Sequence, residues 1–366
     1  MRADEFCFAV TDGTHDSPKP QLAGKKLITS KHLKGAYIDF DSANWIQEED
    51  YKKIVLRSKV DQWDILYSMI GTIGNLYMEK NPNTEYACKN VGIFKFGGNK
   101  NNAYWLYYYL QSKNVRKYLN AQLRGSTQSY IPLGALREMP VIVPPKDVRI
   151  KIIYVLKSLD DKIELNNAIN NNLEEQAQAI FDNMFPDISN GENTIGDTIT
   201  PKRGKGLLSK NAVFGNVPVV AGGLEPSTYH NTANTVAPVL AISASGANAG
   251  FVSLWNIPIW SSDSSFIDSS MTDDVYFWYV LLKKRQREIY DSQTGSAQPH
   301  IYPQHIAAMP ISDLNFDDVL NYTSIVTPIF EMIGHNKDEN ARLATTRDAL
   351  LPKLMSGELN VSDIDL

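Results

Sequence analysis

Two stretches of the chain are rich in basic side chains, a type that commonly contacts phosphate groups. The first contains Lys19, Lys25, Lys26, Lys31 and Lys34 beside His32 and Tyr37, and the second, "TPKRGKGLLSK", contains Lys202, Arg203, Lys205 and Lys210. Glycines interrupt the second stretch and predict a loop. A basic cluster can also be an ordinary solvated surface, and the residues alone leave both interpretations open.

Two related loops carry small hydroxyl groups and an amide. They contain Ser126, Thr127 and Gln128 in one copy and Ser296, Ala297 and Gln298 in the other. A glutamine amide can form two hydrogen bonds with adenine. However, Gly125 and Gly295 precede the loops, and glycine adopts turn conformations that other residues avoid. Residues shared by both copies cannot readily distinguish two ligands, so we prefer a turn or a phosphate contact over base readout.

The residues immediately before these glycines differ between the copies. Arg124 stands in the first and Thr294 in the second, so Arg124 is a candidate for a contact specific to the first copy. Further upstream, each copy contains a second set of glycines, Gly71 and Gly74 in the first and Gly246 and Gly250 in the second. We interpret these as turn residues too.

The two loops belong to a longer internal repeat. "GSTQSYIPLGALREMP" (residues 125–140) and "GSAQPHIYPQHIAAMP" (residues 295–310) keep Gly, Ser, Gln, Ile, Met and Pro in register at an offset of 170 residues. Upstream of each copy lie an aromatic, helix-like segment (103–123 and 275–293) and an apolar run broken by glycines (64–78 and 238–254). The apolar runs predict strand, tight turn and strand. A repeat of this length indicates two related domains.

A long helix is predicted after each domain, because mostly apolar residues alternate in steps of four and three, as in a coiled coil. The first seam is Ile152, Leu156, Leu159, Ile163, Asn166, Asn170, Leu173, Ala177, Ile180 and Met184, and the second is Tyr322, Val326, Ile329, Ile333, Asn336, Asn340, Leu343, Arg347, Leu350 and Leu354. Two asparagines recur at the same places in both seams. A helix of about 35 residues would span roughly 50 Å.

The seam asparagines allow two interpretations. Either they are solvated where the helices splay apart, or they form a layer that fixes the register of a helix pair at a cost in stability. In an antiparallel pair Asn166 would face Asn340 and Asn170 would face Asn336. In a parallel pair Asn166 would face Asn336 instead, and the spacing does not choose between the two.

These patterns predict a mixed α+β chain with two domains and two long helices. We expect domains at residues 1–145 and 188–312, helices at 146–187 and 313–357, and a loosely held acidic tail at 358–366. The 366 residues, 43% of them hydrophobic, suit about two domains. The net charge of −5 is uneven, since residues 1–145 carry 19 basic and 14 acidic residues whereas residues 313–366 carry 4 and 10. Basic faces on the domains are therefore compatible with an acidic chain.

Several enzyme signatures are absent from the sequence. It contains no GxxxxGK[ST] loop, no GxGxxG after a strand and no HExxH, and "VPPKD" lacks the Asn or Asp of an amino-methyltransferase motif. His300 and His305 are poorly spaced for one metal, and Cys7 and Cys88 are the only cysteines. We therefore expect no cofactor and no metal. The lack of a secretory signal and of an apolar run of about 18 residues favours the cytoplasm.

Three segments resemble the specificity subunits of type I restriction–modification systems. They are "IPLGALREMPVIVPP" (131–145), "SLDDKIELNNAINNNLEEQAQAIFDNMF" (158–185) and "TRDALLPKLMSGEL" (346–359). The resemblance covers essentially the whole chain, strongly in the helices and weakly in the domains. It implies two target-recognition domains that each read half of a bipartite double-stranded DNA sequence. It further implies an antiparallel helix pair that docks two methyltransferase subunits, with restriction subunits in the full complex and a non-catalytic role for this chain.

Within this resemblance the candidate DNA contacts are Lys19, Lys25, Lys31, Arg124, Thr127, Gln128, Lys202, Arg203, Lys205 and Gln298, with Asn166, Asn170, Asn336 and Asn340 setting the helix register. An alternative is a coiled-coil scaffold whose two domains bind protein or glycan. Salt separates the two, because DNA binding weakens steeply as counterions are added.

Overall fold

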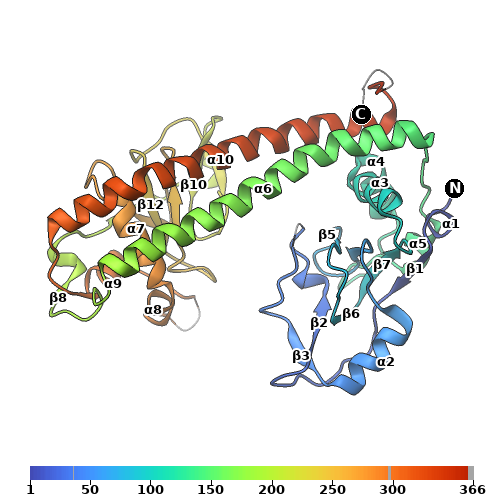
Figure 1. Cartoon of the computed structure of the whole chain (residues 1–366), viewed down its shortest axis with the longest axis horizontal. Helices are drawn as coiled ribbons and strands as arrows, with labels where there is room; N and C mark the ends of the chain where they lie inside the picture. The colour runs from blue at the N-terminus through green and yellow to red at the C-terminus, as the bar shows by residue number, and fades with distance from the viewer. Residues whose placement is uncertain (36, 296–297, 362–366) are drawn as a thin grey trace. The chain divides into compact units, whose positions relative to one another are not determined.

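The computed structural model describes residues 1–35, 37–295 and 298–361 (Figure 1). The chain folds into two compact units. Unit 1 comprises Met1–Asp161 and the described residues from Leu343 onward, and unit 2 comprises Lys162–Arg342. Each unit contains part of both long helices, α6 (Lys146–Met184) and α10 (Phe316–Ser356). Each unit is therefore assembled from segments that are far apart in the sequence.

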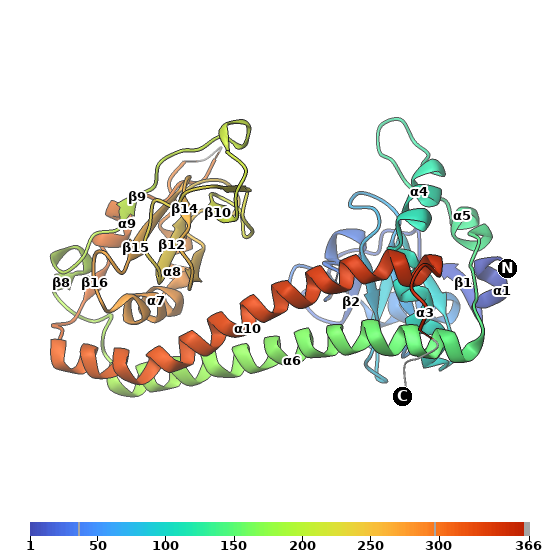
Figure 2. The ribbon, with the colours of Figure 1, turned by 90° about the horizontal axis from the view of Figure 1, so that it is seen from above.

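The heptad seams hold α6 and α10 together. Within each unit the two helices lie side by side in both views (Figures 1 and 2). Every seam residue predicted above is buried or half-buried. In unit 2 Asn166 contacts Asn340 and Asn336 contacts Asn170, which is the antiparallel pairing. The predicted mixed α+β class with two long antiparallel helices is confirmed.

Unit 1 contains a four-stranded antiparallel sheet and a smaller three-stranded sheet. Its elements are α1 (Ala3–Phe6), β1 (Ala9–Asp12), β2 (Lys25–Thr29), the 3-10 helix η1 (Ser30–His32), β3 (Asn44–Ile46), α2 (Glu48–Ser58), β4 (Ile65–Ser68), β5 (Leu76–Met78), β6 (Tyr86–Lys89), β7 (Val91–Lys95), α3 (Lys100–Gln111), α4 (Lys113–Ala121) and α5 (Leu133–Glu138). The large sheet has the order β1-β7-β4-β5 and the small sheet the order β3-β2-β6, with β2 and β6 parallel.

Unit 2 repeats this arrangement. Its elements are β8 (Asn193–Thr194), η2 (Ile195–Asp197), β9 (Lys202–Arg203), η3 (Ser209–Asn211), β10 (Val217–Val220), β11 (Thr228–His230), β12 (Val239–Ser243), β13 (Val252–Trp255), β14 (Trp260–Ser261), β15 (Ser264–Asp268), α7 (Val275–Lys284), α8 (Gln286–Asp291), α9 (Pro303–Ala307) and β16 (Pro310–Ile311). The large sheet has the order β9-β15-β12-β13 and the small sheet the order β11-β10-β14, with β10 and β14 parallel; β8 pairs with β16.

Matching strand orders show that the internal repeat extends over both sheets. The pair β4–β5 corresponds to β12–β13, β7 to β15 and β1 to β9, while β2, β3 and β6 correspond to β10, β11 and β14. Both predicted strand–turn–strand runs are confirmed, since β4 pairs with β5 and β12 with β13 in antiparallel register. The repeat is therefore a property of the fold that only short stretches of the sequence retain.

Each aromatic segment forms two helices rather than one. In unit 1 Ser112 takes an extended conformation (ψ 146°) between α3 and α4, and its hydroxyl accepts a hydrogen bond from the backbone of Val115, which caps α4. In unit 2 the break falls at Arg285, whose buried guanidinium binds Glu288 and the carbonyl of Pro310. The prediction missed these breaks because the aromatic pattern continues through them.

The core of unit 1 depends on the end of the chain. Leu351 and Leu354 of α10 pack with Leu156 of α6 and with Trp105 of α3 in one apolar cluster. Val361 belongs to the same cluster and is only 3% exposed. The prediction of a loosely held tail is wrong for this residue, because burying its side chain against the core stabilises the segment; residues 362–366 lie outside the described part of the chain.

No helix in the described part of the chain combines the length and the hydrophobicity of a membrane span.

Candidate nucleic-acid interface

The residues that close the GSxQ loops have the same backbone geometry in both units. In unit 1 Arg124 and Tyr130 exchange two backbone hydrogen bonds (2.9 and 2.8 Å), and in unit 2 Thr294 and His300 do the same (3.0 and 2.8 Å). Gly125 and Gly295, just inside these pairs, have φ of +92° and +95°. Each loop is therefore closed by one residue pair, as in a hairpin.

Glycine is required at the start of each loop. A Cβ added to Gly125 would lie 2.4 Å from the carbonyl oxygen of Gln128, and one added to Gly295 would lie 2.5 Å from that of Gln298. Such distances force the backbone to move, and the positive φ adds strain for any other residue. The shared glycines are thus explained by the turn, as the sequence indicated.

Both hairpins are attached to the large sheet just after its central strand. Ile131 donates a backbone hydrogen bond to Met69 beyond β4 (2.9 Å), and Ile301 donates one to Ala244 beyond β12 (2.9 Å). Gly246 also donates to Pro299 within the second loop (3.0 Å). The structure therefore brings the predicted turn glycines next to the predicted GSxQ loops.

The candidate side chains of the two hairpins are accessible to a ligand. Arg124, Thr127, Gln128 and Gln298 are all exposed. Ser296 and Ala297, which complete the second copy, lie outside the described residues. The hairpin therefore presents an arginine in unit 1 where unit 2 presents a threonine, in an otherwise common framework.

The first basic cluster surrounds the small sheet of unit 1. Lys19 and Lys31 are exposed, whereas Lys25 on β2 is half-buried and binds Glu85 (3.1 Å), a hydrogen bond that raises the pKa of the lysine. Lys26 donates to the carbonyl of Ala43 (2.9 Å) and lies over the ring of Trp45. Lys19 and Lys31 are therefore better placed for phosphate contact than Lys25.

The second basic cluster lies on the edge strand β9 and the loop after it. Lys202, Lys205 and Lys210 are exposed and, within the described residues, have no ion-pair partner. Arg203 binds Asp263 (2.5 Å) on the loop before β15. Three of the four cations thus remain available for a polyanion.

The same edge strand in unit 1 carries the opposite charge, a difference the sequence analysis missed. Gly13 after β1 donates a backbone hydrogen bond to Val91 (2.9 Å), and Gly204 after β9 donates one to Ser264 (2.8 Å). Asp12 and Arg203, immediately before these glycines, occupy equivalent positions. In the sequence the two edge strands share only the glycine of "TDG" and "KRG". This similarity is too short to align the two segments unless the strand pairing is known.

The side chain of Asp12 contacts basic side chains. Its carboxylate is buried and binds Arg57 of α2 (2.5 Å) and His15 (3.0 Å), and these residues line an open pocket with Arg137. Arg137 in turn donates to the carbonyl of Val10 (2.9 Å). At this position unit 1 therefore has a buried carboxylate paired with Arg57, whereas unit 2 has an arginine paired with Asp263.

The seam asparagines of unit 2 form an asparagine layer of two pairs, each hydrogen-bonded across the helices. Asn166 donates to the side chains of Asn340 (2.9 Å) and Glu339 (2.7 Å), and Asn336 donates to Asn170 (2.8 Å). Asn166, Asn170 and Asn336 are at most 9% exposed. Buried amides that pair across the helices oppose slippage of one helix along the other, because a shift would leave them unpaired.

The seam also has a charged exception, Arg347, in unit 1. Its guanidinium donates to Asp160 of α6 (2.7 Å), and the hydroxyl of Tyr108 on α3 donates to the other carboxylate oxygen (2.7 Å). Burial and the Asp160 charge raise the pKa of Tyr108 above its usual range, so the phenol remains a donor. One carboxylate therefore connects both long helices to the globular part of unit 1.

The described residues contain no group of three or more His, Cys, Asp or Glu side chains arranged to hold a metal ion. Cys7 and Cys88 are both buried and unpaired, and burial raises the pKa of each thiol. Neither is therefore a reactive thiolate at neutral pH.

The chain is similar in sequence to known proteins of one class. A family profile described as "Type I restriction modification DNA specificity domain" matches residues 22–175. The chain is 26% identical to the type I restriction enzyme MjaIX specificity subunit of Methanocaldococcus jannaschii, covering 94% of this chain and 88% of that protein. It is also 26% identical to the HindI specificity subunit of Haemophilus influenzae, over 49% of this chain and 41% of that one.

A solved structure shows the same fold. The S subunit of the type I restriction–modification system from M. genitalium superposes with a TM-score of 0.55 at 17% identity, covering 97% of this chain and 95% of that one. In sequence and in fold the chain is therefore similar to the specificity subunits of type I restriction–modification systems.

Proposed function

We propose that this subunit reads a bipartite DNA target, with residues 1–145 on one half-site and residues 188–312 on the other. The proposal is supported by a framework that is duplicated, combined with residues that differ at equivalent positions of the two copies. The two hairpins share their glycine and backbone pairing but differ at Arg124 and Thr294. The two edge strands share their glycine but differ at Asp12 and Arg203. Two related domains that read different half-sites would need a common backbone framework and different residues at the contact positions.

Lysines and arginines around these frameworks would hold the DNA by its phosphates. In unit 2 these are Lys202, Lys205 and Lys210, and in unit 1 Lys19 and Lys31. Arg124, Thr127, Gln128 and Gln298, which are exposed on the hairpins, would contact the same DNA. Phosphate contacts fix the register of a protein on DNA, and base contacts supply the specificity.

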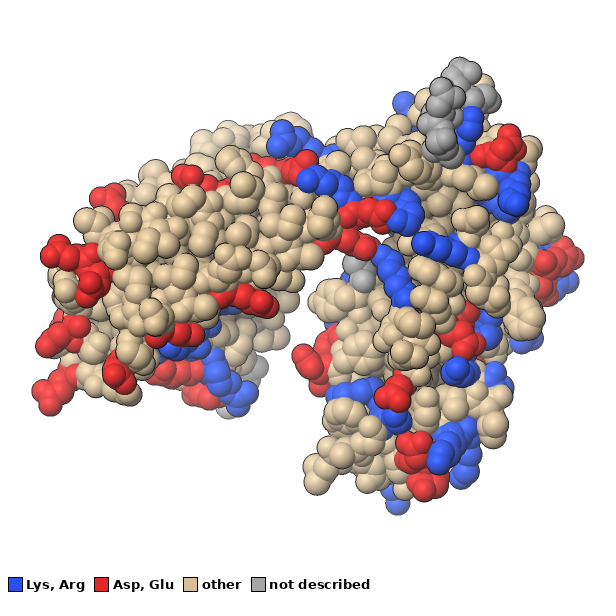
Figure 3. Space-filling model, in the orientation of Figure 1, with Lys and Arg blue, Asp and Glu red and all other residues tan. Residues whose placement is uncertain are grey.

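The long helices would dock the methyltransferase subunits, two of them, and through these the restriction subunits. Part of each helix in unit 2 exposes apolar side chains despite the pairing of α6 with α10: Leu165 (55%), Ile169 (38%), Ile325 (42%) and Met332 (50%). Figure 3 shows a broad uncharged area over this part of the helices. Exposed apolar area on a rigid element suits a protein partner.

In this proposal the subunit is non-catalytic, works without a cofactor, and acts in the cytoplasm. Methylation and cleavage are supplied by its partners, and the subunit determines where they act.

The proposal is tested by long-read detection of methylated bases in the host genome, with and without the gene. We expect one bipartite methylated motif that disappears on deletion and returns on complementation. If the subunit and its methyltransferase partner are both expressed and no motif depends on the gene, the proposal is wrong.

Salt dependence tests the same proposal on the isolated chain. Binding to duplex DNA through at least six phosphates should weaken about 10³-fold between 50 and 200 mM salt. Binding of a glycan or of an apolar peptide should change little over this range. Salt-independent binding would favour the scaffold alternative.

A further inference from the structure

Both small sheets present an aromatic side chain at the same place. Trp45 on β3 lies opposite Lys26 of β2, and Tyr229 on β11 lies opposite Pro218 of β10. The next residues of β2 and β10 pair with Ala87 of β6 and Trp260 of β14, respectively. These registers make Trp45 and Tyr229 equivalent. They are 37% and 54% exposed.

A glycine packs against the end of the sheet beside each aromatic residue. A Cβ on Gly24 would lie 2.1 Å from the carbonyl oxygen of Ile46, and one on Gly215 would lie 2.3 Å from that of His230. Ile46 and His230 directly follow Trp45 and Tyr229 in the sequence. Only glycine allows this approach, so both loops are held against the same backbone position.

The residues before these glycines extend into solvent. Leu22, two positions before Gly24, is 100% exposed, and Phe214, directly before Gly215, is 96% exposed. The backbone of Val213 donates to Nδ1 of buried His230 (3.0 Å), which fixes the loop beside Phe214. Each unit therefore holds one almost fully exposed apolar side chain on an anchored loop beside one aromatic side chain of a strand.

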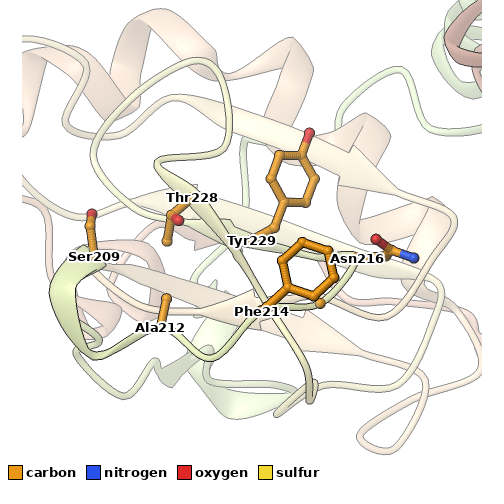
Figure 4. Close-up of a pocket in the computed structure, with 7 residues that line it drawn as sticks. Ser209, Ala212, Phe214, Asn216, Thr228 and Tyr229 are labelled. Carbon is orange, nitrogen blue, oxygen red and sulfur yellow. The ribbon is translucent and has the colours of Figure 1, made fainter. Parts of the chain in front are cut away.

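In unit 2 these side chains line an open pocket of about 560 Å³. Figure 4 shows Phe214 and Tyr229 next to each other in its middle, with Ser209 on one side and Asn216 on the other. Two rings flanked by a hydroxyl and an amide suit the edges of base pairs, where apolar thymine methyl groups lie beside hydrogen-bonding atoms.

The surrounding charge favours a polyanion as the occupant. Residues 201–216, which lead into the pocket, contain Lys202, Arg203, Lys205 and Lys210 and no acidic residue. In unit 1 the Nζ atom of Lys26 lies 4.0 Å from the centre of the Trp45 ring. Apolar side chains surrounded by cations are typical of proteins that contact bases while neutralising the nearby phosphates.

We propose that Leu22 with Trp45, and Phe214 with Tyr229, make apolar contacts with the bases of the two half-sites of duplex DNA, one pair to each half. The inference rests on the proposed function and names the residues that carry its specificity. Sequence analysis missed all four, because the two loops differ in length by one residue and share only their glycine.

The test is a binding selection with the full-length chain on a pool of duplexes with randomised positions. Wild-type protein should enrich a bipartite motif. Phe214→Ala and Tyr229→Ala should lose preference at one or two positions of one half-site, with about a tenfold loss of affinity for the selected duplex. Leu22→Ala and Trp45→Ala should do the same at the other half-site.

Matched control variants distinguish the loss of a DNA contact from a loss of protein stability. Phe316→Ala on α10 and Leu56→Ala on α2 remove side chains that are 62% and 88% exposed in the same two units, and should leave the motif unchanged. Lys205→Ala should weaken binding to all duplexes alike and lower the salt slope by about one. Melting curves confirm that each variant is folded.

The outcomes are distinguishable. If wild-type protein enriches no motif, the proposed function itself fails. If it enriches a motif that folded Phe214→Ala and Trp45→Ala proteins reproduce at full affinity, the base-contact inference is wrong. An unchanged motif with weaker capture of the methyltransferase subunit by Phe214→Ala would assign this surface to a protein partner instead.

Discussion

Among single residues, the glycines of the two hairpins are under severe steric constraint. Gly125→Ala places a Cβ 2.4 Å from a backbone oxygen at a φ of +92°, so we expect a loss of about 1–3 kcal/mol in the stability of unit 1. Gly71→Ala meets nothing within 4 Å and should cost only about 1 kcal/mol through its positive φ. Thermal unfolding of the full-length variants measures the difference.

Gly134 in α5 provides the control for this comparison. It has open space and no positive φ, so Gly134→Ala should be neutral or stabilise by up to about 1 kcal/mol. Equal losses at Gly125 and Gly134 would contradict the turn as the reason for the shared glycine.

His32 gives unit 1 a pH dependence. Burial lowers the pKa of His32 below its ordinary value of 6.5, with a further contribution from Lys31. The unfolded chain therefore binds the proton more readily, and stability falls as the pH drops through 6.5. Lowering the pH from 7.5 to 5.5 should decrease the melting temperature less in His32→Gln than in wild-type protein. An identical decrease in both proteins would rule out His32 as a contributor.

At the scale of the elements, we expect the asparagine layer to fix the alignment of the two long helices at a cost in stability. Asn336→Leu alone leaves the buried carbonyl of Asn170 without its donor, and should destabilise the protein by about 1–3 kcal/mol. Adding Asn170→Leu should recover most of this loss, because the two leucines pack as an ordinary seam layer. Chemical denaturation of the two single variants and the double variant measures the coupling.

The alignment of α6 with α10 can also be measured directly. Cross-linking of cysteines introduced on the facing helices should give one alignment in the wild-type background and several when all four seam asparagines become leucine. A single alignment in both backgrounds would show that the asparagines do not set the register.

At the scale of the whole molecule, the two readers should be interchangeable. Replacing residues 188–312 with the corresponding segment of a relative should change one half of the methylated motif and leave the other half and the gap unchanged. Long-read methylation sequencing of a host carrying the exchanged gene provides the readout. Changes in both halves would contradict one reader per half-site.

The sequence predicted the features that depend on local pattern. The heptad seams, the strand–turn–strand runs and the turn at Gly125 follow from periodicity or from one residue type, and the structure confirms them. The equivalence of Asp12 with Arg203, or of Trp45 with Tyr229, depends instead on strand registers. Long-range pairing sets those registers, and the sequence between the strands has diverged too far to align.

The contribution of residues 343–361 to unit 1 has a consequence for synthesis on the ribosome. Leu351, Leu354 and Val361 complete a core whose other members begin at Ala3. Translation of unit 1 therefore begins first, but its core cannot close until residues 351–361 have emerged. Unit 2, whose segments all lie between Lys162 and Arg342, can be completed earlier. A nascent chain would therefore finish unit 2 before unit 1, and termination directly after Arg342 would leave unit 1 with an exposed apolar core.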